Sequence, residues 1–124
     1  MIGEGGTVAT NKALARRLVL ETYGWDEQQY MCLEQLWIKE SSWNHKAANP
    51  TSSARGIAQT MMSLYFPYRE PGSTENTWWR NPKAQEFMNS PSQQIVWGLN
   101  YIRDRKNYGT PCAAWDFWLV NKWY

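Results

Sequence analysis

Glu40 is the residue of this chain whose surroundings best suit acid–base chemistry. An apolar stripe at helical spacing leads up to it and consists of Tyr30, Leu33, Leu36 and Trp37. Glu40 is the next position of that stripe, so we expect its carboxyl group to be partly buried. Burial disfavours the charged form and should raise the pKa of this group. An acid that stays protonated near neutral pH is what general-acid cleavage of a glycosidic bond requires.

A second carboxylate, which glycosidases usually place across the scissile bond, is not evident in the sequence. Between Glu40 and Asp104 the chain has no Asp, and its acids there are Glu70, Glu75 and Glu86. Glu70 and Glu75 fall in an irregular stretch and could approach the site, whereas Glu86 is typical of a helix surface. The simplest interpretation is a single carboxylate that serves first as acid and then as base, with a hydroxyl of the sugar itself as nucleophile.

The elements that must position Glu40 are predicted to be helices. Capping residues, and Pro at first helical positions, predict helices that begin at Thr10 or Asn11, Asp26, Asn81, Ser90 and Thr110. The first should end at Gly24 and the fourth near Gly109, and residues 56–64 are expected to form a further short helix. Residues 44–55 should form a loop and residues 67–77 should be irregular. Because alternating β-branched runs are almost absent, the predicted class is mainly α.

The bulk composition predicts one domain and excludes several functions. The 124 residues suffice for one modest core, with 1–10 as a flexible, Gly-rich segment and 11–124 as the domain. A formal charge of +2 with scattered basic residues argues against nucleic-acid binding. No run approaches the ~18–20 apolar residues of a membrane span, and no secretory signal is visible. We expect a monomeric domain that reaches any extracytoplasmic target by another route or within a larger protein.

Aromatic residues are unusually abundant, with nine Trp and seven Tyr. So many rings are hard to bury in a small domain, so about half of the Trp should be core while the rest line a groove where rings can stack on sugars. Of the adjacent pair Trp78 and Trp79, one ring should be exposed. Trp43 could belong to either group. His45, the only histidine, is expected to be a solvated loop residue.

The two cysteines, Cys32 and Cys112, stand 80 residues apart and match no zinc-site spacing. By themselves they leave two possibilities open, a pair of free buried thiols or a disulfide that would imply an oxidising compartment. The sequence indicates no cofactor and no metal site.

Four short motifs occur in order along the chain. They are Glu-Ser-Ser-Trp-Asn at 40–44, the run 49–59 that ends in Gly-Ile-Ala-Gln, Gln-Ile-Val-Trp-Gly-Leu-Asn-Tyr-Ile at 94–102, and Tyr-Gly at 108–109 followed by Ala-Ala-Trp at 113–115. In type and spacing they resemble the motifs of soluble lytic transglycosylases. The resemblance covers residues 28–124 and is nearest to the actinobacterial and actinophage form, which in phages often lies inside a tail tape-measure protein.

The resemblance implies a lysozyme-like fold, with helices around a catalytic helix and a substrate groove. It implies cleavage of the MurNAc–GlcNAc β-1,4 bond of peptidoglycan without water, leaving a 1,6-anhydro-MurNAc end. Glu40 would protonate the glycosidic oxygen and then take the proton of the muramyl C6 hydroxyl. The candidate substrate-binding residues are Ser42, Trp43, Gln59, Tyr101, Trp115 and Tyr124. Cys32 and Cys112 would form a disulfide, and the protein would act on the cell wall, associated with a virion tail or after secretion.

One departure from the family pattern bears on the catalytic acid. Trp115 and Asp116 stand where the family usually has Tyr-Asn. A Tyr hydroxyl helps to tune the catalytic Glu, whereas an indole offers only a donor. Trp115 could substitute, or Tyr101 or Tyr124 could supply the hydroxyl. Two alternatives remain, a goose-type-like hydrolase that activates water with a later acid such as Asp116, and a wall-binding module without turnover.

Overall fold

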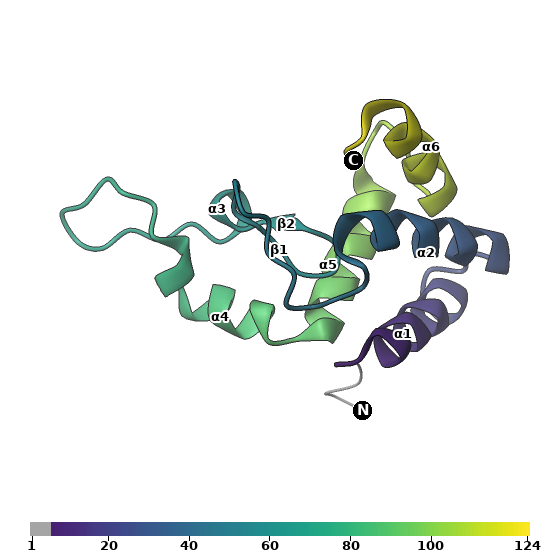
Figure 1. The fold of residues 1–124 in the computed structure, drawn as a ribbon, viewed down its shortest axis with the longest axis horizontal. Coiled ribbons are helices and arrows are strands. Elements are labelled where there is room, and N and C mark those ends of the chain that lie inside the picture. Colours follow the sequence, from purple (N-terminus) through teal and green to yellow (C-terminus); the bar gives the residue numbers. More distant parts are fainter. Residues whose placement is uncertain (1–5) are drawn as a thin grey trace.

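Helices make up most of the described chain, which confirms the mainly α class predicted from the sequence (Figure 1). The structure, a computed structural model, describes residues 6–124. Its helices are α1 (Val8–Glu21), α2 (Glu27–Ser41), α3 (Met62–Tyr65), the 3-10 turn η1 (Trp78–Arg80), α4 (Pro82–Met88), α5 (Pro91–Asp104) and α6 (Pro111–Asn121). Within residues 6–124, no helix combines the length and the apolar character that crossing a membrane requires.

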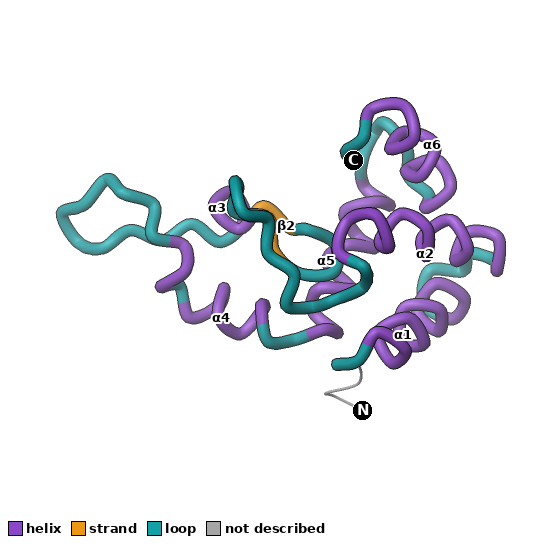
Figure 2. The backbone as a smooth tube through the Cα atoms, in the orientation of Figure 1, coloured by secondary structure: helices purple, strands orange, loops and turns teal. Residues whose placement is uncertain are grey.

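The helix α5 lies between two groups of elements (Figure 2). On one side are α1, α2 and α6, and on the other are α3, α4, η1 and the strands β1 (Ala54–Arg55) and β2 (Thr60–Met61). The strands pair antiparallel, with Ala54 opposite Met61 and Arg55 opposite Thr60. The irregular segment 67–77 projects away from the rest of the chain, as an excursion closed by a 2.7 Å hydrogen bond from Thr77 N to Tyr68 O.

The apolar stripe that predicted α2 is its buried face. The main core contains the four stripe residues together with residues of α1, α5 and α6, among them Leu14, Val19, Ile95, Leu99, Ile102 and Ala114. A smaller cluster under the projecting segment holds Met62, Trp78, Ala84 and Phe87. In the pair Trp78–Trp79 one ring is buried at 8% exposure and the other is exposed at 47%, as predicted.

Gly98 allows the side chain of Trp37 in α2 to lie directly against α5. A Cβ at this position would lie 2.5 Å from Cζ2 of Trp37 and 2.8 Å from Cβ of Ala58. Both neighbours are buried, so neither can move aside at low cost. The side chain of Trp37 therefore lies directly against the backbone of α5.

Gln94 is a buried amide that joins the start of α5 to the turn between β1 and β2 and to the end of α4. Its Oε1 accepts a hydrogen bond from Ile57 N (2.9 Å), and its Nε2 donates to the carbonyl of Phe87 (3.0 Å). Gly56 makes room for it, because a Cβ there would lie 2.4 Å from Oε1 of Gln94 and the residue has a φ of +83°. The turn that leads to Gln59 is thereby fixed to α5.

Three predicted helix boundaries and one predicted helix are wrong, and one of these boundaries is the end of the first helix, which lies at Glu21 instead of Gly24. The first helix begins at Val8 instead of near Thr10, because Thr7 caps it through reciprocal hydrogen bonds with Thr10. Residues 8–10 are therefore helical, while residues 1–5 of the predicted flexible segment lie outside the described residues. The expected helix over 56–64 is a turn between β1 and β2 followed by the four residues of α3.

The helix α5 ends at Asp104 instead of near Gly109. Arg105 is extended, and the chain turns back so that Gly109 N donates to the carbonyl of Ile102 at 3.1 Å. Gly109 accommodates the return with a φ of +91°.

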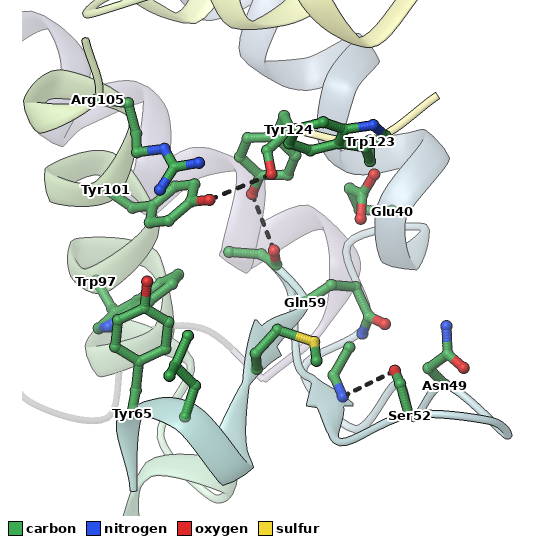
Figure 3. A pocket seen from close by; sticks show the side chains of 14 residues that line it. Glu40, Asn49, Ser52, Gln59, Tyr65, Trp97, Tyr101, Arg105, Trp123 and Tyr124 are labelled. Atoms are coloured by element: carbon green, nitrogen blue, oxygen red, sulfur yellow. Dashed lines mark hydrogen bonds between the residues drawn. The ribbon is translucent and has the colours of Figure 1, made fainter. Parts of the chain in front are cut away.

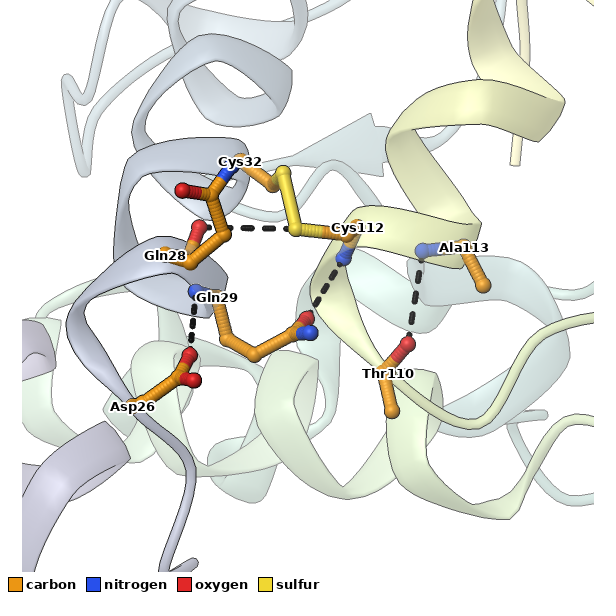
Figure 4. Close-up of a disulfide and its surroundings, with 7 residues drawn as sticks. All are labelled: Asp26, Gln28, Gln29, Cys32, Thr110, Cys112 and Ala113. Atoms are coloured by element: carbon orange, nitrogen blue, oxygen red, sulfur yellow. Dashed lines mark hydrogen bonds between the residues drawn. A yellow bond between two sulfur atoms is a disulfide. The ribbon is translucent and has the colours of Figure 1, made fainter.

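A disulfide joins Cys32 in α2 to Cys112 in the first turn of α6, with the two Cα atoms 4.9 Å apart (Figure 4). This pairing was expected from the family resemblance. Next to it, Gln29 N donates to the capping side chain of Asp26 at 3.1 Å. The side chain of Gln29 crosses to α6, where its Oε1 accepts a hydrogen bond from Cys112 N at 2.8 Å. One end of α6 is therefore held to α2 both covalently and by a hydrogen bond.

Replacing Gly98 by Ala should destabilise the protein, although Ala is the better helix former by about 1 kcal/mol. Overpacking against a rigid core costs about 1–3 kcal/mol. Because a Cβ at Gly98 would lie within 2.8 Å of two buried side chains, we expect the upper end of that cost and a net loss of about 2 kcal/mol in urea unfolding. Val96→Ala, on the exposed side of the same helix, is the control and should change stability by less than about 0.5 kcal/mol. A Gly98→Ala protein as stable as wild type would contradict this close approach.

Thiol counting on the denatured, unreduced protein should find no free thiol, because Cys32 and Cys112 are paired. Reduction removes the cross-link of an 80-residue loop. In the chain-entropy model we expect it to lower the free energy of unfolding by up to about 4.5 kcal/mol. The Cys32→Ser/Cys112→Ser double variant should show the same loss and no further response to reductant. Two reactive thiols in the unreduced protein would refute the bond.

Candidate active site

A cavity of about 420 Å³ lies where the end of α2 faces the strands, α5 and the C-terminal residues (Figure 3). Its walls are rich in aromatic and neutral polar side chains. The lining residues are Glu40, Asn49, Ser52, Ala54, Ala58, Gln59, Met61, Leu64, Tyr65, Trp97, Tyr101, Arg105, Trp123 and Tyr124. Four residues predicted from the sequence, Glu40, Gln59, Tyr101 and Tyr124, therefore meet in one cavity although up to 84 positions separate them.

Glu40 is half-buried in the last turn of α2. Burial raises the pKa of its carboxyl group, and a hydrogen bond from Trp118 lowers the pKa by a smaller amount. The net upward direction is the one expected from the apolar stripe. A larger share of Glu40 is therefore protonated near neutral pH than of an exposed glutamate, which suits a general acid.

The donor to Glu40 is Trp118, which sequence reasoning missed. Its Nε1 lies 2.8 Å from Oε2 of Glu40 and donates to it. Trp115, the predicted neighbour of Glu40, does not line the cavity and instead stacks on Trp118, with ring centroids 5.6 Å apart and an interplanar angle of 14°. The signal was available in the sequence, because Trp118 is three positions after Trp115 and shares its helix face.

The two tyrosines proposed as hydroxyl donors to Glu40 donate their hydroxyl protons to backbone carbonyls instead. The hydroxyl of Tyr124 donates to the carbonyl of Ala58 (2.9 Å) and accepts from Nε1 of Trp37 (2.9 Å). The hydroxyl of Tyr101 donates to the backbone carbonyl of Tyr124 at 3.2 Å. A phenol has a single proton to donate, so neither hydroxyl donates to Glu40 in this structure. Burial, and then the charge of Glu40, raise the pKa of Tyr124 well above its ordinary value.

Gln59 lines the cavity from the turn between β1 and β2. It has a left-handed backbone with a φ of +57°, and its Nε2 donates to the carbonyl of Gly56 at 2.9 Å. One end of its amide thus stabilises the turn. Gln59 therefore stabilises the turn through its own side chain and also borders the cavity.

Besides Trp115, two more predicted substrate-binding residues, Ser42 and Trp43, lie outside the cavity. Trp43 is fully buried, meets Trp37 edge to face at 5.1 Å and donates from Nε1 to the carbonyl of Glu34 at 3.1 Å. It is a core residue, and its assignment to the groove is wrong because no face of its ring is accessible. Ser42 is exposed as the left-handed C-cap of α2 and is not among the lining residues. Its neighbour Ser41 instead ties α2 to the turn, donating to the carbonyl of Ile57 at 2.6 Å.

Glu40 is the only carboxylate among the residues that line the cavity. Glu70 lies in the projecting segment and forms an exposed ion pair with Arg80 at 3.4 Å. Asp116 is exposed on α6 and does not line the cavity. Among the described residues 6–124, no group of three or more His, Cys, Asp and Glu is placed to hold a metal ion.

Sequence reasoning also missed part of the aromatic wall. Trp97 stacks on Tyr101 at 5.0 Å with an interplanar angle of 18°, and Tyr65 meets Trp97 edge to face at 5.0 Å. Trp123, which is 53% exposed, borders the same cavity from the C-terminal segment. Trp97 precedes Tyr101 by four positions in a predicted helix, so helical spacing alone could have paired them.

Comparisons of this chain with models of protein families, with curated proteins and with solved structures found no match.

Replacing Trp118 by Phe should raise the pKa of Glu40 further, because the lost N–H donor stabilises the charged carboxylate. The pKa can be followed by NMR titration of the side-chain carboxyl carbon of Glu40. Trp115→Phe is the matched control, since Trp115 stacks on Trp118 without contributing to the pKa of Glu40, and it should leave the titration nearly unchanged. A lower or unchanged pKa in the Trp118→Phe protein would show that the indole does not stabilise the carboxylate.

Proposed function

We propose that this protein is a peptidoglycan lytic transglycosylase in which Glu40 is the sole acid and base. The observation that carries the proposal is one half-buried carboxylate with a raised pKa, standing alone in a cavity with aromatic walls. The order of the four sequence motifs supports the same family, and with it a lysozyme-like fold in which α2 is the catalytic helix.

In the proposed reaction, protonated Glu40 gives its proton to the oxygen that links C1 of MurNAc to C4 of GlcNAc. The C1–O bond breaks and the GlcNAc chain leaves with a free C4 hydroxyl. The C6 hydroxyl of MurNAc then attacks C1, and ionised Glu40 takes the proton released from it. The carboxyl group ends as it began, and no water is consumed. One carboxylate suffices for this sequence, whereas hydrolysis would need a second group to activate water.

The residues around Glu40 suit this double role. Burial favours the neutral acid that the first step needs. The N–H of Trp118 stabilises the carboxylate that the second step needs, at 2.8 Å. The hydroxyls of Tyr101 and Tyr124 hold backbone carbonyls, so they act on the shape of the cavity and leave the proton transfers to Glu40.

The cavity walls suit a sugar polymer. Flat rings such as Trp97 and Trp123 can stack on the apolar faces of pyranose rings, and Asn49, Ser52 and Gln59 offer neutral polar groups to hydroxyls and acetamides. The disulfide favours action outside reducing compartments. We therefore propose cell-wall glycan strands as the substrate, cleaved from a virion tail or by a secreted protein.

Digestion of purified peptidoglycan followed by mass spectrometry tests the proposal. The wild-type protein should release muropeptides with 1,6-anhydro-MurNAc ends, each lighter by one water than a hydrolysis product. Glu40→Gln should lose at least about a hundredfold in rate, since acid–base catalysis contributes about 10²–10⁴-fold, while binding to cell walls is retained.

Asp116→Asn is the matched control, because Asp116 is exposed and outside the cavity. It should keep the wild-type rate if Glu40 acts alone. Products with reducing ends would show that the protein is a hydrolase and not a transglycosylase. Binding to cell walls without any product would show that it is a binding module.

A further inference from the structure

Three side chains at intervals of four residues form a stack along one wall of the cavity. Trp97 and Tyr101 project from α5 and are nearly parallel, with centroids 5.0 Å apart. Arg105, just after the end of α5, places its guanidinium carbon 4.8 Å from the ring centroid of Tyr101. The hydroxyl of Tyr101 is fixed by the carbonyl of Tyr124 at 3.2 Å. The guanidinium therefore rests on a ring that is itself held in place.

Arg105 sits where two hollows meet. It borders the cavity of Glu40, and with Tyr65, Trp97 and Tyr101 it also borders an adjoining hollow of about 260 Å³. Figure 3 shows Arg105 on the α5 side and Glu40 on the opposite side, with Tyr124 between them. A chain-like ligand that reaches Glu40 can therefore pass Arg105.

The positive charge of Arg105 has no carboxylate partner within the described residues 6–124. The adjacent Asp104 forms its ion pair with Arg103 at 2.9 Å. The side chains that interact with Arg105 are those of Tyr101 and Tyr108, and both are neutral phenols. Arg105 is also the only cation among the residues that line the cavity of Glu40, and Glu40 is the only acid.

From this geometry we infer that Arg105 is a subsite for a carboxylate carried by the ligand, which selects acidic glycan strands over neutral ones. Stacking on Tyr101 uses the face of the guanidinium, and Tyr108 interacts with part of its edge. The remaining N–H donors of the five form a planar fork that matches the two oxygens of a carboxylate. A neutral β-1,4-linked GlcNAc polymer would leave this charge unpaired. The inference rests on the proposed function for the identity of the strand, whose carboxylate is either the lactyl group of MurNAc or a group of its peptide.

The test compares glycan strands that carry free carboxylates with the same strands after conversion of those carboxylates to methylamides. Wild type should cleave the charged strands with a kcat/KM about ten to a hundred times higher, the range expected for a hydrogen-bonded pair involving charged groups. Arg105→Gln should abolish this preference, so that the ratio of kcat/KM on charged strands to kcat/KM on amidated strands falls to about one.

Arg103→Gln, two positions earlier and paired with Asp104, is the matched control and should keep the wild-type preference. Peptide-free and peptide-bearing strands, each with its amidated counterpart, identify which carboxylate is read. An equal rate on charged and amidated strands, or an equal loss on both in Arg105→Gln, would overturn the subsite.

Binding separates this inference from the proposed function. Calorimetry of the Glu40→Gln protein with both kinds of strand should give a tighter Kd for the charged strands, lost in Glu40→Gln/Arg105→Gln and weakened by salt. If the wild-type protein cuts nothing but this difference in Kd remains, the proposed reaction fails and the subsite stands. If anhydro products form but Kd and kcat/KM are the same for charged and amidated strands, the subsite is refuted and the proposed reaction is retained.

Discussion

The close contact of Trp37 with the backbone of α5 at Gly98 is the constraint on which the rest of the structure depends. A single Cβ at Gly98 would occupy the space of the indole, so the distance between α2 and α5 is set by the width of one aromatic ring. Trp37 is fully buried, and truncating such a residue typically costs about 3–5 kcal/mol. Its Nε1 also donates to the hydroxyl of Tyr124, which fixes the C-terminal residue against the same core.

The contact between Trp37 and α5 also determines the geometry of the candidate site. Glu40 follows Trp37 by three positions, so the packing of Trp37 determines which side of α2 faces the cavity. The hydroxyl of Tyr124 bridges Trp37 to the carbonyl of Ala58, which joins α2, the turn between β1 and β2 and the C-terminal residues in one network. Gln94 anchors the same turn from α5 through Ile57. The elements that form the cavity are thus joined to one another by side-chain hydrogen bonds.

The helix α6 is held to α2 at two separate places. At its start, the disulfide and the bond from Cys112 N to Gln29 fix it, and further along, Trp118 donates to Glu40. The half-buried Glu40 costs stability whenever it is ionised. Holding α6 covalently at the far end lets the protein keep this destabilising acid, with its one compensating donor, in a defined position.

The sequence by itself determined the local features: the mainly α class, the caps at Asp26, Ser90 and Thr110, and the burial of the stripe that ends at Glu40. These follow from helical periodicity and from side chains that bond to their own neighbours. It did not determine which distant groups meet. Trp115, Tyr101 and Tyr124 were the candidates beside Glu40, where Trp118 donates, and Trp43 was a candidate for the groove although it is buried in the core. Gly109 donates a backbone hydrogen bond to Ile102, and Arg105 stacks on Tyr101. Both contacts form only when the helices have packed. Tertiary structure decided these contacts, because they depend on the distances between helices, and those distances are set by the volumes of buried rings.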